Sequence, residues 1–216
     1  MSTNKRELDS THGIPLTASY PQLKSKTSAR PVKHRPHRIA SAPPSDYLHV
    51  NVDGRETSYF EWMGAGFYST DRSVNIDDDS ICLLRELSYG FSEQYFYLRI
   101  DTFPELLPKL RDCEFQIIVR GSEELRLDTL IEGRCLVGWL LETDDLSILG
   151  PHPFVKVAFE RILEVAIDRR LLPLAGQATF ALKVGLWERG FPSDFLPLED
   201  SLEVKLGIDA FAWPVH

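Results

Sequence analysis

Two kinds of side chain in this sequence could carry chemistry, and the first is the carboxylate. A pair of carboxyl groups about 5–5.5 Å apart can act as nucleophile and acid/base across a glycosidic bond. Glu61, beside Trp62, and Glu86 lie on predicted strands. In an acidic domain such residues usually face solvent or pair with arginine. We therefore predict no catalytic residue.

The second kind is the aromatic ring, because flat Trp and Tyr side chains stack on the apolar faces of sugars with little loss of entropy. Tyr95 and Tyr97 alternate with Phe96 and Leu98, so we expect both tyrosines on the sheet face opposite the core. Tryptophan in a β-sandwich is usually a core residue, so we expect two or three of the four to be largely buried. The predicted carbohydrate or partner surface consists of Tyr59, Trp62, Tyr95, Tyr97, Trp139 and Trp187.

Metal and cofactor motifs give a weaker signal. Residues 77–79 are three aspartates that offer the oxygen ligands calcium prefers, but the glycine and closing glutamate of an EF-hand are missing, which favours a solvated loop. His34 and His37 lie close together only in the polar N-terminal segment. The chain has no His-Glu-x-x-His, Gly-x-Gly-x-x-Gly or Gly-x-Ser-x-Gly motif. We predict no metal and no cofactor.

Charge divides the chain into two parts. Residues 1–45 hold eight Lys and Arg against two Asp and Glu, whereas residues 46–216 hold sixteen against thirty. The Pro-rich, basic first part predicts a disordered tail, although it could also touch an anionic partner weakly. The acidic second part is poorly suited to binding nucleic acid.

The cysteines and the absence of long apolar runs indicate a compartment. Cys82, Cys113 and Cys135 are odd in number and lie in apolar runs, which predicts reduced core thiols. The sequence shows no secretory signal and no run of about 20 apolar residues, so we expect neither secretion nor a membrane span. The expected location is the cytoplasm.

Short β-rich runs separated by turn residues must position these side chains. They predict an all-β fold, an antiparallel two-sheet sandwich over residues 46–216. Residues 154–171 also fit an amphipathic helix, but we favour a strand at 160–167. The other predicted strands are 47–52, 58–68, 81–89, 94–101, 114–119, 134–142, 178–187 and 202–206.

Several of these runs carry a family resemblance over residues 36–215. They are the Asp-Gly turn and aromatic strand of 53–66, with the bend at Gly64 and Gly66, then Tyr-Phe-Tyr-Leu-Arg-Ile-Asp at 95–101 and Phe-Ala-Trp-Pro-Val at 211–215. This pattern resembles the C-terminal all-β region of glycoside hydrolase family 57. In that family an N-terminal barrel carries the catalytic glutamate and aspartate, and no segment here matches the barrel.

The resemblance implies a non-catalytic accessory sandwich that supports α-glucan metabolism. Such a module would dock on a separate catalytic barrel or bind the glucan itself. Two alternatives stay open: a stand-alone protein-interaction module without a carbohydrate role, and an enzyme with an unrecognised site. The chain could be a complete gene product or a piece of a longer one.

Overall fold

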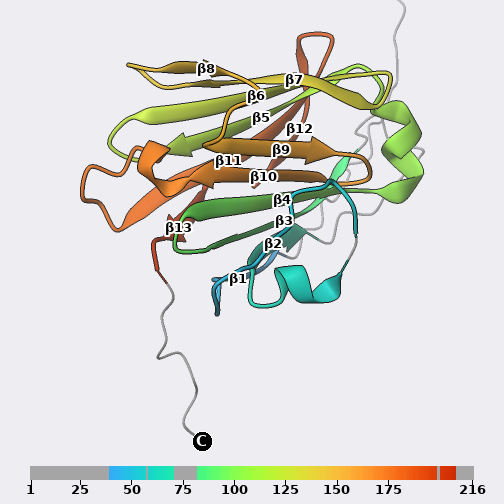
Figure 1. Cartoon of the computed structure of the whole chain (residues 1–216). Helices are drawn as coiled ribbons and strands as arrows, with labels where there is room; N and C mark the ends of the chain where they lie inside the picture. Colours follow the sequence, from blue (N-terminus) through green and yellow to red (C-terminus); the bar gives the residue numbers. More distant parts are fainter. Residues whose placement is uncertain (1–38, 57, 71–81, 199, 208–216) are drawn as a thin grey trace, which may run out of the picture. The chain divides into compact units, whose positions relative to one another are not determined.

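The computed structural model describes residues 39–56, 58–70, 82–198 and 200–207. These residues form two antiparallel sheets that pack against each other, and their helical segments are three short 3-10 helices (Figure 1). The predicted all-β, two-sheet sandwich is confirmed. The predicted tail up to residue 38, the aspartates at 77–79 and Trp213 lie outside the described residues.

Sheet A has six strands in the order β1-β2-β3-β4-β10-β9. Sheet B follows the order β12-β11-β5-β6-β7-β8, with β13 also paired to β11. The strands of sheet A are β1 (Ile39–Ala42), β2 (Gly66–Thr70), β3 (Leu84–Phe91), β4 (Tyr95–Thr102), β10 (Leu163–Asp168) and β9 (Val155–Phe159). Those of sheet B are β12 (Phe191–Leu196), β11 (Thr179–Glu188), β5 (Cys113–Arg120), β6 (Glu124–Glu132), β7 (Cys135–Glu142), β8 (Ser147–Leu149) and β13 (Leu202–Lys205). The 3-10 helices are η1 (Tyr59–Trp62), η2 (Pro104–Lys109) and η3 (Arg169–Leu171).

The core lies between the two sheets and follows the two-residue period of the strands. On β4, Phe96, Leu98 and Ile100 are fully buried, as the alternation predicts. The Phe96 ring meets the edge of Phe180 from β11 at 5.2 Å between centroids, which joins the two sheets. Each such side chain contributes about 1.5–3 kcal/mol on burial.

The start of the sandwich differs from the prediction. β1 lies inside the segment predicted as tail and pairs with β2, so the ordered part begins by Ile39 rather than at residue 46. Residues 47–52 form no strand, and the predicted strand at 58–68 is η1 followed by β2. β1 is an edge strand with mostly exposed side chains, so it has no apolar alternation that a sequence could reveal.

Residues 154–171 form the β9–β10 hairpin followed by η3, so the strand interpretation is confirmed and the helix is wrong. All six residues of β10 are buried. Leu163, Val165 and Ile167 face the core, while the alternate residues Glu164 and Ala166 lie under other parts of the chain. A helix would have left one side of this segment in solvent.

The three cysteines are free thiols, but they are not all core residues. Cys113 is buried, Cys82 is partly buried, and Cys135 is exposed at the start of β7, which corrects the prediction for that residue. Burial, followed by the nearby charges of Glu188, Asp112 and Glu114, raises the pKa of Cys113 to about 12. Cys113 is therefore an unreactive thiol at neutral pH.

Asp168, the last residue of β10, has a lowered pKa, so its contribution to stability should depend on pH. Asp168 is buried and accepts hydrogen bonds from Arg170 Nε and Nη2 at 2.9 and 2.7 Å. The hydrogen bond from the Arg170 side chain is the main cause that lowers the pKa of Asp168 to about 2. A depressed carboxylate pKa stabilises the fold above the ordinary value of 3.8, and this contribution is lost as the pH falls through about 2.

We expect Asp168→Asn to lower the free energy of unfolding by about 2 kcal/mol at pH 7. Urea unfolding of both proteins between pH 7 and pH 2 measures the difference, which should shrink below pH 3.8. A difference that stays constant over this range would show that the charge of Asp168 has no part in it.

Candidate functional site

A long connection crosses the outer face of sheet A. We call residues 43–56 and 58–65 the strap; they run from β1 through η1 to β2 (Figure 1). Leu48 of the strap is buried against sheet A, and its N–H donates to Phe91 O at 2.7 Å. Leu48 packs with Tyr97 and Ala166 in a second apolar cluster, separate from the main core. The strap therefore covers much of the face that the sequence predicts to be open.

Glu164 on β10 holds the strap in place. Its carboxylate is fully buried, and Oε2 accepts hydrogen bonds from Asp53 N at 3.0 Å and Gly54 N at 2.9 Å. The other oxygen, Oε1, accepts from Trp62 Nε1 at 3.0 Å. Two successive backbone N–H groups in a turn form a ready site for a carboxylate.

Gly54 makes this turn possible. Its φ of +76° lies in the left-handed region, and an added Cβ would lie 2.8 Å from the backbone nitrogens of Phe159 and Glu160. The Asp53–Gly54 pair thus supplies the positive φ that its sequence suggests. The pair binds Glu164 instead of joining two strands, so the predicted turn is present but the strands predicted on either side of it, at 47–52 and 58–68, are not formed as predicted.

Arg99 lies beside Glu164 in the register of β4 and β10. It forms two hydrogen bonds of 2.8 Å to the buried carboxylate of Asp101, and Glu56 of the strap lies 3.5 Å from its guanidinium. Burial opposes the charge on Arg99, but the hydrogen bond and the charge of Asp101 raise its pKa above the ordinary value. The polar groups under the strap therefore bond one another and form a structural network.

The alternation correctly places Tyr95 and Tyr97 opposite the core, but the strap changes their environment. Tyr97 is only 8% exposed and packs against Leu48. It is therefore not an open platform. Tyr95 is half-buried, its ring centroid lies 6.0 Å from that of Tyr97, and Lys156 Nζ lies 4.8 Å above its ring.

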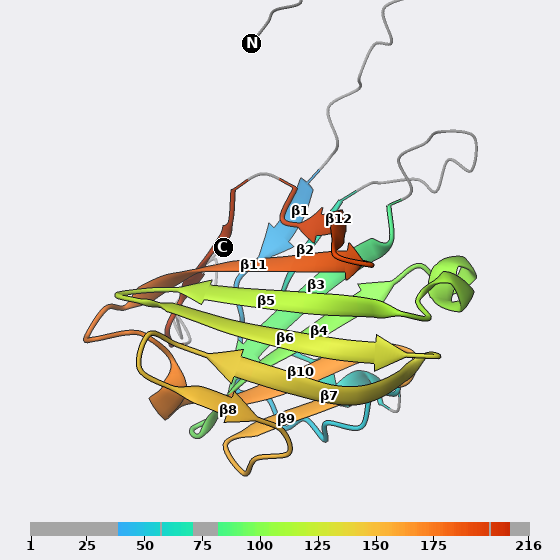
Figure 2. The same ribbon diagram turned by 90° about the horizontal axis from the view of Figure 1, so that it is seen from above.

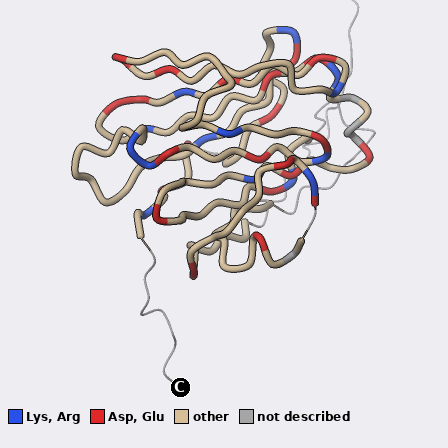
Figure 3. The backbone as a smooth tube through the Cα atoms, viewed as in Figure 1, with Lys and Arg blue, Asp and Glu red and all other residues tan. Residues whose placement is uncertain are grey.

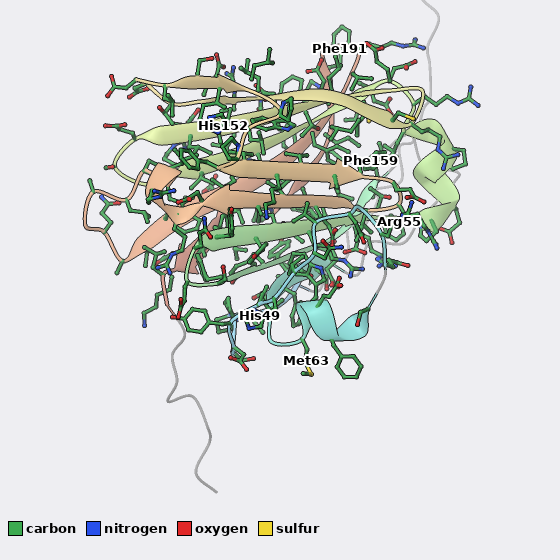
Figure 4. All side chains as sticks on the ribbon, in the orientation of Figure 1. His49, Arg55, Met63, His152, Phe159 and Phe191 are labelled. Carbon is green, nitrogen blue, oxygen red and sulfur yellow. The ribbon has the colours of Figure 1, made fainter. Side chains whose placement is uncertain are left out.

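A surface hollow of about 410 Å³ opens where the strap passes the β3–β4 turn. Its size falls within the usual range of ligand pockets, about 300–1,000 Å³. Ser92 shapes the turn, because its Oγ accepts hydrogen bonds from the backbone N–H groups of Gln94 and Tyr95. Figure 4 labels His49 on the strap. We call this site the tyrosine hollow; its lining residues are Tyr47, His49, Ser92, Glu93, Gln94, Tyr95 and Tyr97.

The tyrosine hollow combines aromatic rings with an amide, an imidazole and a carboxylate. Tyrosine rings can stack on the apolar face of a sugar, while Gln94, His49 and Glu93 can bond its hydroxyl groups. The sequence prediction included Tyr95 and Tyr97 but missed the other residues. Tyr47 and His49 come from the strap, nearly fifty residues before Tyr95, so only the fold brings them together.

The remaining predicted site residues do not join this hollow. Trp62 is half-buried and bonded to Glu164, and the side chain of Tyr59 on η1 lies outside the described part. Trp139 is 7% exposed and lines the main core, so it is not a surface platform. Trp187 is half-buried on sheet B, where its ring meets Phe195 edge-on at 6.4 Å.

The two candidate catalytic carboxylates come from different elements. Glu61 lies on η1 rather than on a strand, and Glu86 lies on β3, where it accepts a hydrogen bond from Ser88 Oγ at 3.4 Å. Within the described ranges, no group of three or more His, Cys, Asp or Glu side chains could hold a metal ion. None of the helices described is long and apolar enough to span a membrane.

Comparison with family models, curated proteins and solved structures finds no match to this chain. The fold and the tyrosine hollow are therefore the basis on which a function can be argued.

Proposed function

We propose that this chain is a non-catalytic accessory β-sandwich that supports α-glucan metabolism by binding glucan at the tyrosine hollow. The observation that carries the proposal is the composition of that hollow, in which tyrosine rings lie beside an amide, an imidazole and a carboxylate. The resemblance of the sequence to the C-terminal region of glycoside hydrolase family 57 supports the choice of an α-glucan. Three free cysteines support a cytoplasmic location.

A second candidate function is docking on a protein partner, either a separate glycoside hydrolase barrel or an unrelated protein. It is favoured by the end of η1, where Phe60 is 74% exposed and the neighbouring Met63 is also exposed. Figure 4 shows Met63 projecting from the strap beyond the sheets. Exposed apolar side chains of this size are common at protein interfaces.

The proposal predicts binding without turnover. Purified protein should migrate more slowly in a native gel that contains soluble starch than in a gel without it, while a starch digest should release no new reducing ends. A catalytic barrel added separately should supply the hydrolysis. If the chain itself releases reducing ends after stringent purification, and Glu86→Gln abolishes that activity, the chain is an enzyme and the proposal fails.

A further inference from the structure

The outer face of sheet B carries a groove that the proposed function does not use. Strands β5, β6, β7 and β8 lie side by side, and no described element covers them (Figure 2). Two hollows of about 440 and 300 Å³ adjoin there, since Glu114 and Leu130 line both. We call the two together the β5–β8 groove.

The floor of the groove is aliphatic. Leu140 pairs with Leu149 across β7 and β8, and Leu130 pairs with Gly138 across β6 and β7. Gly138 helps to form the hollow, because nothing lies within 4 Å of the position of an added Cβ. Leu149 is 73% exposed on the edge strand, so the floor continues to the rim of the sheet.

Along the polar wall of the groove, the positive charge of Arg126 is neutralised by neighbouring carboxylates. Arg126 donates to Asp128 at 2.8 Å and also pairs with Glu142. The second oxygen of Asp128 accepts from Gln116 Nε2 at 3.0 Å. Two carboxylates therefore compensate one guanidinium, and the side chain of Glu114 adds a further negative charge.

The neighbouring hollow extends the negative field. Asp112 and Glu132 line it beside Arg189, and they lie close to Glu114. The pKa of the Cys113 thiol reflects these charges. Burial raises this pKa most, and the negative charges of Glu188, Asp112 and Glu114 raise it further. Carboxylates are spread over both sheets (Figure 3), so negative charge alone does not distinguish this groove. Its distinguishing feature is that negative charge lies beside an aliphatic floor.

We propose that the β5–β8 groove binds a basic segment of a partner protein through lysine or arginine side chains. Their aliphatic stems would lie on Leu130, Leu140 and Leu149, and their cationic ends would meet Glu114 and Asp128. Long basic side chains bury their stems on apolar surface while the charge stays near solvent and carboxylates. A neutral sugar fits less well, because Trp139, the aromatic residue that lines the groove, is only 7% exposed and offers little ring surface for stacking.

The inference is independent of glucan binding and can be tested with a defined probe. A fluorescent, end-blocked peptide of alternating Lys and Leu is titrated with the full-length chain at low salt, and anisotropy gives the Kd. We expect Glu114→Gln to raise the Kd about five-fold, within the range of a single surface ion pair. Leu149→Ser should weaken binding as well, and added salt should raise the Kd.

The matched control is Glu203→Gln, which removes an exposed carboxylate on β13 of the same sheet, outside the groove. It should leave the Kd within about two-fold of the wild-type value. The proposal is overturned if the peptide does not bind, if Glu203→Gln and Glu114→Gln weaken it equally, or if a Glu–Leu peptide binds as well. Displacement of the peptide by maltoheptaose would also overturn it, because the groove would then be a sugar site.

Discussion

Replacing Glu164 by alanine should lower the free energy of unfolding by about 3–5 kcal/mol, because the strap loses its main polar contact with sheet A. The buried carboxylate accepts from the N–H groups of Asp53 and Gly54 and from Trp62 Nε1. Hydrogen bonds to a charged acceptor contribute about 1.5–3 kcal/mol each, and donors left without a partner add a desolvation cost. Urea unfolding monitored by circular dichroism measures the loss.

The matched control is Glu160→Ala, four residues earlier in the chain. Glu160 pairs with Arg55 of the strap, but both side chains are largely exposed. An exposed ion pair contributes about 0–1 kcal/mol, so this variant should remain close to wild type. Equal losses for Glu160→Ala and Glu164→Ala would refute the role assigned to the buried carboxylate. Because the strap supplies Tyr47 and His49, Glu164→Ala should also weaken glucan binding.

Trp139→Ala should have the second large effect, a loss of about 3–5 kcal/mol in the free energy of unfolding. Its ring lies in the core and covers Gly150, where an added Cβ would overlap the indole. Alanine would leave a cavity the size of the indole between β7 and the segment after β8. Glucan affinity of the remaining folded protein should not change, because Trp139 lies on sheet B.

Trp187→Phe is the control for Trp139→Ala. The indole N–H of Trp187 is buried without a hydrogen-bond partner among the described residues, so exchanging it for a phenyl ring removes no bond. The free energy of unfolding should change by less than about 1.5 kcal/mol. Thermal unfolding of the two variants should therefore differ clearly. If Trp139→Ala unfolds like wild type but loses sugar binding, then Trp139 is the surface platform that the sequence suggested.

The strands of the core could be predicted because their burial leaves a two-residue period in the sequence. β4 shows it at Phe96, Leu98 and Ile100, which are fully buried. β6 carries the same period at the buried residues Leu125 and Leu127, so this strand, which our prediction lacks, is also encoded in the local sequence. β1 could not be found in this way, since its side chains at the sheet edge are mostly exposed.

The strap could not be predicted from local sequence. Aromatic residues at 59–62 favour a strand by propensity, but Ser58 caps a 3-10 turn there, and the Trp62 side chain bonds to Glu164 on β10. Tertiary contacts between distant residues thus decide the local structure. The tyrosine hollow depends on the same contacts, because Leu48 N bonds to Phe91 O and so brings the strap beside the β3–β4 turn.

Titration of the full-length chain with maltoheptaose, followed by calorimetry, tests the central claim most directly. We predict saturable binding to the wild type that weakens about ten-fold in Tyr95→Ala, in line with the loss of one aromatic contact. Phe191→Ala, which removes an aromatic ring that is 74% exposed on β12 (Figure 4), should bind like wild type. Absence of binding to the wild type, or equal weakening in the Tyr95 and Phe191 variants, would contradict a glucan site at the tyrosine hollow.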